Sequence, residues 1–272
     1  MAGDEGRLAR AALAAGAETV VAVGGDGTWS QVADAVVGSG ARLALLPSGT
    51  GNDFGRNLGL SFGSPEDAVR ALAGGKTRRV DVGRVVTPSA PDAERGRPDA
   101  YRPRNFLNLV GFGFDIAVID AAAGARFLKG ALLYKLTALQ QLFRYPGIDV
   151  TVDSPAHGSR AGRRLILTIS NGRFFGGGFP IAPGATVDDG LLHACVIGDG
   201  APLRRFALFN RAERGQHVGA AEVEILSDTR FGVRFPTAGP PPRFEVDGDV
   251  YGVQGHTVEV EVLPGALDVI VP

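Results

Sequence analysis

The sequence has very little cysteine: Cys195 is the only one among its 272 residues. A single cysteine excludes an internal disulfide framework and a zinc site built on cysteines. The four histidines are far apart in the chain and form no cluster of metal ligands at a typical spacing. We therefore expect Cys195, which lies inside a strand-like run, to be a small buried hydrophobe.

The sequence also lacks an excess of charge and a long apolar run. Lys and Arg number 28 against 29 Asp and Glu, whereas a dedicated nucleic-acid-binding protein carries a basic excess. No transmembrane segment is predicted, because charged residues interrupt the best candidate, residues 116–143. Charged residues among the first 20 positions argue against a secretory signal peptide. The sequence thus predicts a cytoplasmic protein that does not bind nucleic acid.

Glycine, in contrast, is abundant, with 40 residues, about twice the roughly 7% of an average protein. The glycines show no period of three, which excludes a collagen repeat, and the 44% of hydrophobic residues argue against general disorder. Glycine is favoured where the backbone adopts positive φ or where a ligand approaches it closely. The positions of the glycines therefore bear on function.

The first part of the chain alternates short apolar runs with helical patterns. Continuous apolar runs are typical of strands that are buried on both faces of a sheet. Strands that alternate with helices at this spacing predict a parallel, doubly wound α/β sheet. The predicted strands are residues 19–23, 43–46 and 80–86, and the predicted helices are residues 5–15, 28–37, 65–72 and one that Asn52 or Asp53 begins.

The rest of the chain has a different pattern, with short apolar runs separated by turn residues. Their close spacing predicts an antiparallel β-sandwich or barrel, interrupted by one helical stretch at about residues 115–143. We therefore predict an α/β domain at residues 1–84 and a β-sandwich domain at residues 85–259, with residues 260–272 as a candidate for rejoining the first domain. Residues 87–104 are predicted to be a surface loop. The predicted strands are residues 106–110, 148–152, 165–169, 191–196, 223–226, 232–235, 244–246, 257–263 and 267–271.

Two glycine-rich loops follow the first two predicted strands, at Gly24–Thr28 and Pro47–Phe54. Glycines at a strand-to-helix junction let the backbone approach a phosphate, and the first turn of the helix offers unpaired N–H groups. The first loop is not a Walker A loop, because no Lys-Ser/Thr follows at the required spacing. Both loops would lie at the carboxyl edge of one parallel sheet, where open α/β sheets bind ligands.

These two loops, GGDGT and PSGTGNDF, resemble those of the diacylglycerol kinase and bacterial lipid kinase family. The resemblance implies a nucleotide-binding α/β domain joined to a β-sandwich domain that receives the lipid. It also implies a lipid kinase that uses ATP and Mg²⁺ to phosphorylate a lipid hydroxyl, with diacylglycerol converted to phosphatidic acid as the leading case. Further motifs continue the resemblance in family order at residues 80–83, 108–115, 176–178, 181–183, 188–191 and 247–249.

The resemblance also implies partners and a place of action. The substrate would be a lipid at a membrane surface, where the cytoplasmic protein would bind transiently, and the protein could be a homodimer. Two elements are candidates for facing the lipid: Gly176–Phe179 and the segment 115–143. A stripe of leucines at helical spacing in that segment is nevertheless more typical of a core. The leucines of the stripe are Leu128, Leu132, Leu136 and Leu139.

The site residues that the resemblance implies are mostly glycines and carboxylates. Phosphoryl transfer needs charge neutralisation and in-line positioning, and Mg²⁺ takes one or two carboxylates beside water and phosphate. A second, structural Mg²⁺ site would use the Asp189 carboxylate and the carbonyls of Thr186 and Leu191. Taken singly, such acids are also typical of helix caps and turns. The nucleotide-binding residues would be Gly24, Gly25, Asp26, Gly27, Thr28, Gly49, Thr50, Asn52 and Asp53, and the acids near the nucleotide's metal would be Asp26, Asp53 and Asp81.

The segment Asp247-Gly248-Asp249 lies between two strand-like runs and, from its residues alone, predicts a hairpin turn. The resemblance implies that Asp247 or Asp249 is the general base that accepts the proton of the lipid hydroxyl. The family usually has Asp-Gly-Glu here, so the last acid is one methylene shorter in this sequence. We therefore expect Asp247 to be the base.

Two departures from the family pattern keep other functions open. Trp29-Ser30-Gln31 stand where the family usually has Leu-Asn-Glu, and the chain starts inside the helix that precedes the first glycine loop. We therefore expect the family's usual first strand, with its Asn-Pro loop, to be missing. The alternatives to an active lipid kinase are a catalytically inactive remnant that binds lipid or nucleotide, and a soluble-substrate kinase related to NAD kinase.

Overall fold

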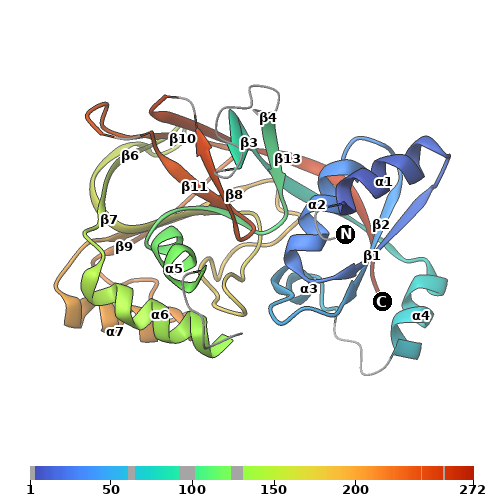
Figure 1. Ribbon diagram of the computed structural model, residues 1–272, viewed down its shortest axis with the longest axis horizontal. Coiled ribbons are helices and arrows are strands. Elements are labelled where there is room, and N and C mark those ends of the chain that lie inside the picture. Colours follow the sequence, from blue (N-terminus) through green and yellow to red (C-terminus); the bar gives the residue numbers. More distant parts are fainter. Residues whose placement is uncertain (1–3, 61–64, 92–101, 124–130, 240, 254) are drawn as a thin grey trace.

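Strand β13 (Thr257–Ile270) connects the two parts of the molecule. The computed structural model describes residues 4–60, 65–91, 102–123, 131–239, 241–253 and 255–272. The first half of β13 pairs with β10 (Arg230–Arg234) of the β-domain, whereas its last residues pair with β2 (Arg42–Pro47) of the α/β part. Figure 1 shows this strand crossing from one part to the other, toward the C-terminus.

The α/β part contains the parallel strands. β1 (Thr19–Gly24) pairs with β2 along its whole length, and the end of β13 adds a third parallel strand on the other side of β2. The apolar run of β2 is buried against helix α2 (Asp26–Val36), whose Trp29 is fully buried in the same core as Leu43. The other helices of this part are α1 (Glu5–Ala14), α3 (Asp53–Asn57) and α4 (Pro65–Gly74).

The third predicted strand, β3 (Thr77–Pro91), does not continue the parallel sheet. It pairs antiparallel with β13, from Thr77 opposite Ile270 to Val85 opposite Val260. Beyond Val85 it enters the β-domain and pairs with strands there. The prediction that this strand is parallel is therefore wrong, because the C-terminal strand β13 takes the place beside β2.

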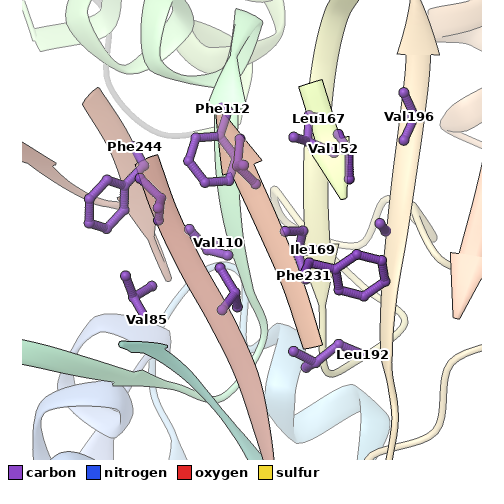
Figure 2. Packing of buried hydrophobic residues seen from close by; sticks show 14 of the residues in the cluster. Val85, Val110, Phe112, Val152, Leu167, Ile169, Leu192, Val196, Phe231 and Phe244 are labelled. Carbon is purple, nitrogen blue, oxygen red and sulfur yellow. The ribbon is translucent and has the colours of Figure 1, made fainter. Parts of the chain in front are cut away.

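The β-domain is antiparallel throughout, as the short apolar runs predict. Its core collects apolar side chains from most of the strands, including Phe112, Phe231 and Phe244, all fully buried (Figure 2). The rings of Phe112 and Phe244 pack with their centroids 6.0 Å apart. The strands are β4 (Arg102–Phe106), β5 (Leu109–Gly113), β6 (Ile148–Ser154), β7 (Gly158–Ser170), β8 (Leu192–Gly198), β9 (Val223–Asp228), β10, β11 (Arg243–Val246) and β12 (Asp249–Val253), with the ends of β3 and β13.

Three helices cover part of the β-domain. The single predicted helical stretch is two helices, α5 (Phe114–Ala123) and α6 (Ala131–Arg144), with residues 124–130 outside the described part of the chain. Helix α7 (Pro202–Ala212) was not predicted, although Pro202 in its first turn is a typical start signal. None of the described helices is both long enough and apolar enough to span a membrane.

The predicted leucine stripe faces the core only in part. Leu128 lies outside the described residues, Leu139 packs against the core, and Leu136 is 47% exposed. Cys195 is fully buried in β8, as predicted, and burial raises the pKa of its thiol to about 12.

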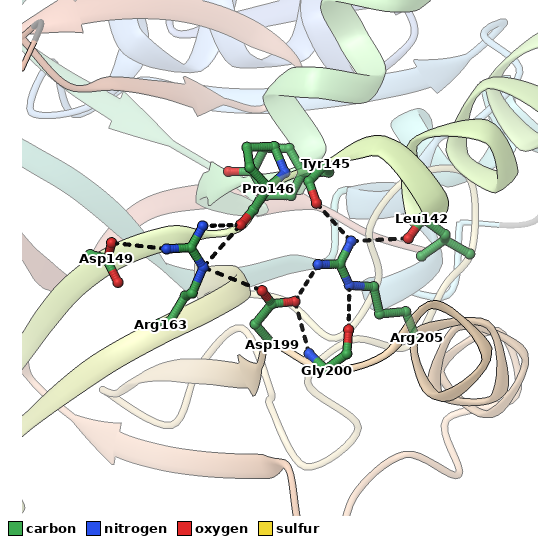
Figure 3. A network of polar contacts seen from close by, with 8 residues as sticks. All are labelled: Leu142, Tyr145, Pro146, Asp149, Arg163, Asp199, Gly200 and Arg205. Carbon is green, nitrogen blue, oxygen red and sulfur yellow. Dashed lines mark hydrogen bonds and ion pairs between the residues drawn. The ribbon is translucent and has the colours of Figure 1, made fainter.

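Arg205 of α7 joins this helix to the end of α6 (Figure 3). Its guanidinium donates to the carbonyls of Leu142 at 3.0 Å and Tyr145 at 2.7 Å, and it pairs with Asp199 at 2.5 Å. The last carbonyls of a helix have no partner within the helix, so the arginine supplies one. Arg163 of β7 pairs with the same Asp199 at 3.5 Å. The network therefore holds α6 and α7 in a fixed relation to the β-domain.

Candidate active site

The two glycine-rich loops lie against each other. A methyl group on Gly49 would lie 2.6 Å from the α-carbon of Gly25, and one on Gly25 would lie 3.1 Å from the α-carbon of Gly49. The N–H of Ser48 donates to the carbonyl of Gly24 at 2.8 Å, which ties the loops together. Backbones can approach this closely only at glycine. Contact between the loops therefore explains two of the glycines that the sequence analysis singled out.

The other predicted nucleotide-binding residues surround the same edge of the sheet. Gly27 and Thr28 lie in the first turn of α2, where backbone N–H groups have no acceptor within the helix. Thr50 is exposed in the second loop. Asn52 has a left-handed backbone with φ of 53° and donates from its side chain to the carbonyl of Gly49 at 2.7 Å. The edge thus offers free N–H groups beside the positive end of a helix, which suits an anion.

Asp26, the first residue of α2, connects the first loop to its surroundings. Its Oδ1 accepts the N–H of Phe54 at 3.1 Å and the side-chain N–H of Asn108 at 3.3 Å. Its Oδ2 accepts no hydrogen bond from a described residue and lies beside Gly51, where a methyl group would come within 2.9 Å of it. Asp26 therefore keeps one oxygen available on the side of the loops.

Asp53, the first residue of α3, is 5% exposed and only partly satisfied. Its Oδ2 accepts the N–H of Gly177 at 2.8 Å, so the triple-glycine segment of the β-domain reaches the second loop. Its buried Oδ1 has no hydrogen-bond partner among the described residues, and Arg56 lies 3.8 Å away. Burial raises the pKa of Asp53 to about 6, the N–H of Gly177 opposes this, and the charge of Asp26 adds to it.

The donor set of Asp26 and Asp53 fits a Mg²⁺ ion. Carboxylate oxygens are preferred Mg²⁺ ligands, and one or two of them usually suffice beside water and phosphate. Asp53 offers a buried oxygen without a partner, and a cation would compensate the two neighbouring negative charges. Across the described residues, no group of three or more His, Cys, Asp or Glu side chains forms a metal cluster. Further ligands would therefore come from water and phosphate.

Asp81 has a different environment. Its Oδ2 accepts the N–H of Gly190 at 2.7 Å, and its Oδ1 accepts the N–H of Gly265 at 2.7 Å. These bonds join β3 to the turn before β8 and to the irregular part of β13. Both oxygens thus have a structural role, and the metal role predicted for Asp81 has no support in these contacts.

The Asp189 carboxylate is bonded within its own turn. Its Oδ1 accepts the N–H of Leu191 at 2.9 Å, and its Oδ2 accepts the N–H of Thr186 at 3.3 Å and its hydroxyl at 3.2 Å. Oδ2 also lies 3.0 Å from Nε2 of His193. The predicted second Mg²⁺ site needs the carbonyls of Thr186 and Leu191, whereas these contacts use their donor groups. That site stays a prediction.

The hairpin between β11 and β12 presents Asp247 on a tight two-residue turn. Asp247 and Gly248 have φ of 47° and 97°, as expected for such a turn. The carboxylate of Asp247 accepts the three successive N–H groups of residues 107–109 at 2.8, 2.9 and 3.1 Å, and also bonds the Ser30 hydroxyl. Burial raises the pKa of Asp247 to about 6 against these donors. The carboxylate therefore anchors the hairpin.

Asp249, two residues later, is exposed and accepts no hydrogen bond from a described residue. Partial burial raises the pKa of Asp249, and the charge of Arg104 opposes the shift. The Arg104 guanidinium lies over the ring of Tyr251, 4.7 Å from its centroid. A carboxylate with unoccupied oxygens can accept a proton. Asp249 therefore has open oxygens, whereas the oxygens of Asp247, which the Asp-Gly-Asp motif led us to expect as the base, are occupied.

Asn108 joins the glycine loops to the hairpin. Its side chain donates to Asp26, and its backbone N–H donates to Asp247. Its carbonyl in turn accepts the N–H of Asn171 at 2.7 Å, and the fully buried side chain of Asn171 donates to the carbonyl of Leu107 at 2.9 Å. Phosphate-side and hairpin-side acids are therefore held in one hydrogen-bonded unit.

Sequence reasoning missed three residues of this unit. Ser30 was noted only as a departure, but its hydroxyl bonds the Asp247 carboxylate. Arg56 donates from Nε to the carbonyl of Gly51 at 3.1 Å and is half exposed beside the loops. A basic residue just after a phosphate-type loop is a signal that could have identified Arg56, whereas nothing near Asn171 in the sequence points to its role.

The chain matches two protein families along nearly its whole length. Residues 1–85 match the family described as diacylglycerol kinase catalytic domain, and residues 108–271 match the YegS C-terminal NAD kinase beta sandwich-like domain. A Mycobacterium tuberculosis protein (strain ATCC 25618 / H37Rv) named "Diacylglycerol kinase" is 28% identical over 269 residues, which cover 99% of this chain and 82% of that protein. A Xanthomonas oryzae pv. oryzae protein (strain MAFF 311018) named "Probable lipid kinase YegS-like" is 35% identical over 202 residues, which cover 72% of this chain and 61% of that protein.

Solved structures have the same fold. A diacylglycerol kinase from Bacillus anthracis str. Sterne matches with a TM-score of 0.67 at 16% identity, over 100% of this chain and 82% of that chain. A yeast NADH kinase in complex with NADH matches with a TM-score of 0.50 at 9% identity, over 94% of this chain and 62% of that chain. These likenesses extend to the antiparallel domain. The structures show the fold, and the family matches show that the chain belongs to the family of diacylglycerol kinases and YegS-like lipid kinases.

Proposed function

We propose that this kinase transfers the γ-phosphate of ATP to a lipid hydroxyl, with diacylglycerol as the substrate and phosphatidic acid as the product. The observation that carries the proposal is the position of Asn108, which bonds Asp26 of the first glycine loop with its side chain and Asp247 of the hairpin with its backbone N–H. The glycine loops are thereby joined to a hairpin that carries one carboxylate with open oxygens, Asp249. A nucleotide and an acceptor could then meet between the two. The relatives named for diacylglycerol and lipid kinase activity support a lipid as that acceptor.

The glycine loops would bind the phosphates of ATP. The N–H groups in the first turn of α2 and the exposed Thr50 are available for phosphate oxygens, and Gly25 and Gly49 keep the loops close enough to act together. Asp26 and Asp53 would hold Mg²⁺, which, when bound, neutralises charge on the phosphates. Arg56 adds a further positive charge at the same edge.

Asp249 would act as the general base. It accepts the proton of the lipid hydroxyl as the hydroxyl oxygen bonds to the γ-phosphorus, and the bond from that phosphorus to the bridging oxygen breaks so that ADP leaves. Asp247 would not move a proton, because its oxygens are occupied by four donors that set the shape of the hairpin.

The lipid would come from a membrane surface, and α6 and α7 suit that surface. Figure 1 shows the two helices side by side on the β-domain. They expose four large apolar side chains: Leu136 at 47%, Phe143 at 56%, Leu203 at 79% and Phe206 at 40%. Exposed apolar side chains of this size insert into the boundary between headgroups and acyl chains.

The charges of α6 and α7 also favour binding to a membrane surface. Neither helix contains Asp or Glu, although the chain as a whole has a net charge of −1. Basic residues beside exposed apolar ones favour a surface of anionic lipid. Arg144 of α6 is exposed and Arg211 of α7 is half-buried, whereas Arg204 pairs with Glu222 at 2.6 Å and Arg205 is buried against Asp199.

Binding to vesicles tests this surface. We expect Leu203→Glu and Phe143→Glu each to weaken sedimentation with phosphatidylglycerol vesicles about tenfold or more, because each removes a large apolar side chain and adds a repelled charge. Leu8→Glu is the matched control, since Leu8 is 55% exposed but lies on α1. Equal binding by all three variants would contradict the assignment of α6 and α7.

The activity is tested with labelled ATP and a panel of acceptors presented in mixed micelles: diacylglycerol, a sphingoid base, phosphatidylglycerol and a polyprenol, with NAD as a soluble acceptor. We expect Mg²⁺-dependent transfer of label to diacylglycerol to exceed transfer to the others. Transfer to NAD alone would favour the soluble-substrate alternative. Nucleotide binding without transfer to any acceptor would favour an inactive protein of the same fold.

A further inference from the structure

A pair of buried acids lies directly behind the hairpin. Glu245 of β11 is fully buried, and Asp115, in the first turn of α5, is 3% exposed. Neither belongs to the residues proposed to bind phosphate or Mg²⁺ or to act as the base. Glu245 lies opposite Gly111 in the pairing of β11 with β5, and Asp115 follows Gly111 by four residues.

Gly111 makes room for both acids. A methyl group on Gly111 would overlap Oδ2 of Asp115 and come within 2.8 Å of Oε1 of Glu245. The two oxygens therefore lie against the same α-carbon although they come from a helix and a strand. Each is buried and has no hydrogen-bond partner among the described residues. Such orphaned oxygens are rare in folded proteins, and two of them facing one point require an explanation.

A shared proton supplies the missing partner. Two ionised carboxylates cannot be buried side by side at low cost, so one of them keeps a proton, and a protonated carboxyl donates an O–H bond to a neighbouring carboxylate. Burial raises the pKa of both acids, and the charge of Asp115 raises that of Glu245 further. Asp247 and Asp249 add negative charge from the hairpin, and Tyr145, after α6, adds no positive charge.

Glu245 also bonds the turn of the hairpin. Its Oε2 accepts the N–H of Gly248 at 2.6 Å, between the anchoring Asp247 and the exposed Asp249. The Asp247 N–H donates in turn to the carbonyl of Leu109 at 3.1 Å. The orientation of Glu245 therefore sets the path of the backbone that carries Asp249.

We propose that Asp115 and Glu245 share one proton and are positioning residues for the hairpin. Asp115 fixes Glu245, and Glu245 holds the Gly248 N–H, so the pair supports the backbone on which Asp249 stands. Loss of the shared proton leaves two carboxylates that repel each other against Gly111 and disturb the bond to Gly248. The effect on catalysis rests on the proposed function, whereas the shared proton does not.

Infrared spectroscopy tests the proton without any substrate. At about pH 8, where acids with a pKa near 6 are ionised, we expect the wild-type protein to show the band of a buried protonated carboxyl. Glu245→Gln and Asp115→Asn should each remove it, because an amide donor then replaces the shared proton. Asp120→Asn is the control, since Asp120 is an exposed acid on α5 paired with Arg243. Absence of the band from the wild type, or its persistence in both variants, would overturn the proposal.

A pH profile tests the positioning role. We expect kcat of the wild type to fall at alkaline pH as the pair loses its proton, and Glu245→Gln to lose this alkaline limb. At neutral pH, Glu245→Ala should lower kcat about 100-fold with the KM for ATP unchanged, and Glu245→Gln by less. An unchanged alkaline limb in Glu245→Gln would refute the role. If no lipid acceptor is found, only the kinetic test is lost, and the infrared result still decides the proton.

Discussion

The candidate active site has two walls, the glycine-loop wall (Gly24–Thr28 and Pro47–Phe54) and the hairpin wall (β11, its turn and β12). Their aspartates differ in how many of the carboxylate oxygens are already hydrogen-bonded. On the side of the glycine loops, Asp53 is buried with Oδ1 unpartnered, and Asp26 keeps Oδ2 open. On the side of the hairpin, the carboxylate of Asp247 is filled by three backbone N–H groups and a hydroxyl. A buried oxygen without a partner is unfavourable unless a ligand supplies one. The glycine-loop wall therefore has carboxylate oxygens available for a ligand, whereas the hydrogen bonds of the hairpin wall fix the conformation of the turn.

The same substitution should thus have opposite effects on stability in the two walls. Asp53→Asn is expected to lower kcat about 100-fold or more, because charge compensation at the phosphates is lost. The free protein should become more stable by about 1–3 kcal/mol, since the buried Oδ1 of Asp53 has no hydrogen-bond partner among the described residues to compensate its charge. Kinetic assays and urea unfolding of this one variant measure both changes. A destabilised Asp53→Asn would break the comparison.

Gly49→Ala tests the contact between the glycine loops. Its methyl group would lie 2.6 Å from the α-carbon of Gly25, so we expect a loss of about 1–3 kcal/mol in the free energy of unfolding. Gly27→Ala is the matched control, because a methyl group there meets nothing within 4 Å and alanine favours the helix. Thermal unfolding should separate the two, and equal melting temperatures would show that the loops do not need this contact.

Asp247→Asn sharpens the comparison from the hairpin side. The carboxamide keeps one acceptor oxygen but turns an NH₂ group toward at least one of the N–H groups of residues 107–109. We expect stability to fall by about 1–3 kcal/mol, because a buried donor loses its acceptor. Urea unfolding beside Asp53→Asn gives the difference in sign directly, and a stabilised Asp247→Asn would contradict the anchoring role.

The smallest effect concerns pH. Because the folded protein raises the pKa of Asp53 from its ordinary value near 3.8 to about 6, ionised Asp53 lowers the stability of the free protein as pH rises between these values. Mg²⁺ and ATP need the ionised form, so their binding should weaken by about tenfold per pH unit below 6. Titration calorimetry checks this, and Asp53→Asn should bind weakly with no such dependence. A pH-independent wild type would exclude Asp53 as a ligand.

The glycine-loop wall could be predicted because its signals are local. Gly24–Thr28 and Pro47–Phe54 each contain the glycines, the acid and the start of the helix within a few residues. The short apolar runs predicted most strands of the β-domain in the same way. The sequence made residues 260–272 a candidate for rejoining the first domain, but the apolar runs did not place β13 beside β2, because strand order depends on contacts between residues more than 200 positions apart.

The hairpin wall could only be predicted in part, for the same physical reason. The turn at Asp247 and Gly248 follows from the residues, but the donors that occupy Asp247 come from residues 107–109, about 140 positions earlier. Ser30 contributes from another domain. Since a carboxylate's role depends on how many of its oxygens are already bonded, the sequence motif could not distinguish Asp247 from Asp249.

The comparison of Asp249→Asn with Asp247→Asn tests the central claim most directly, with transfer of labelled phosphate to diacylglycerol and urea unfolding measured on both. We predict that Asp249→Asn lowers kcat about 10²–10⁴-fold while its free energy of unfolding stays within about 0.5 kcal/mol of the wild type. Asp247→Asn should instead lower the free energy of unfolding by about 1–3 kcal/mol, because a buried donor loses its acceptor. Full activity in Asp249→Asn, with a catalytically dead but fully stable Asp247→Asn, would contradict the account.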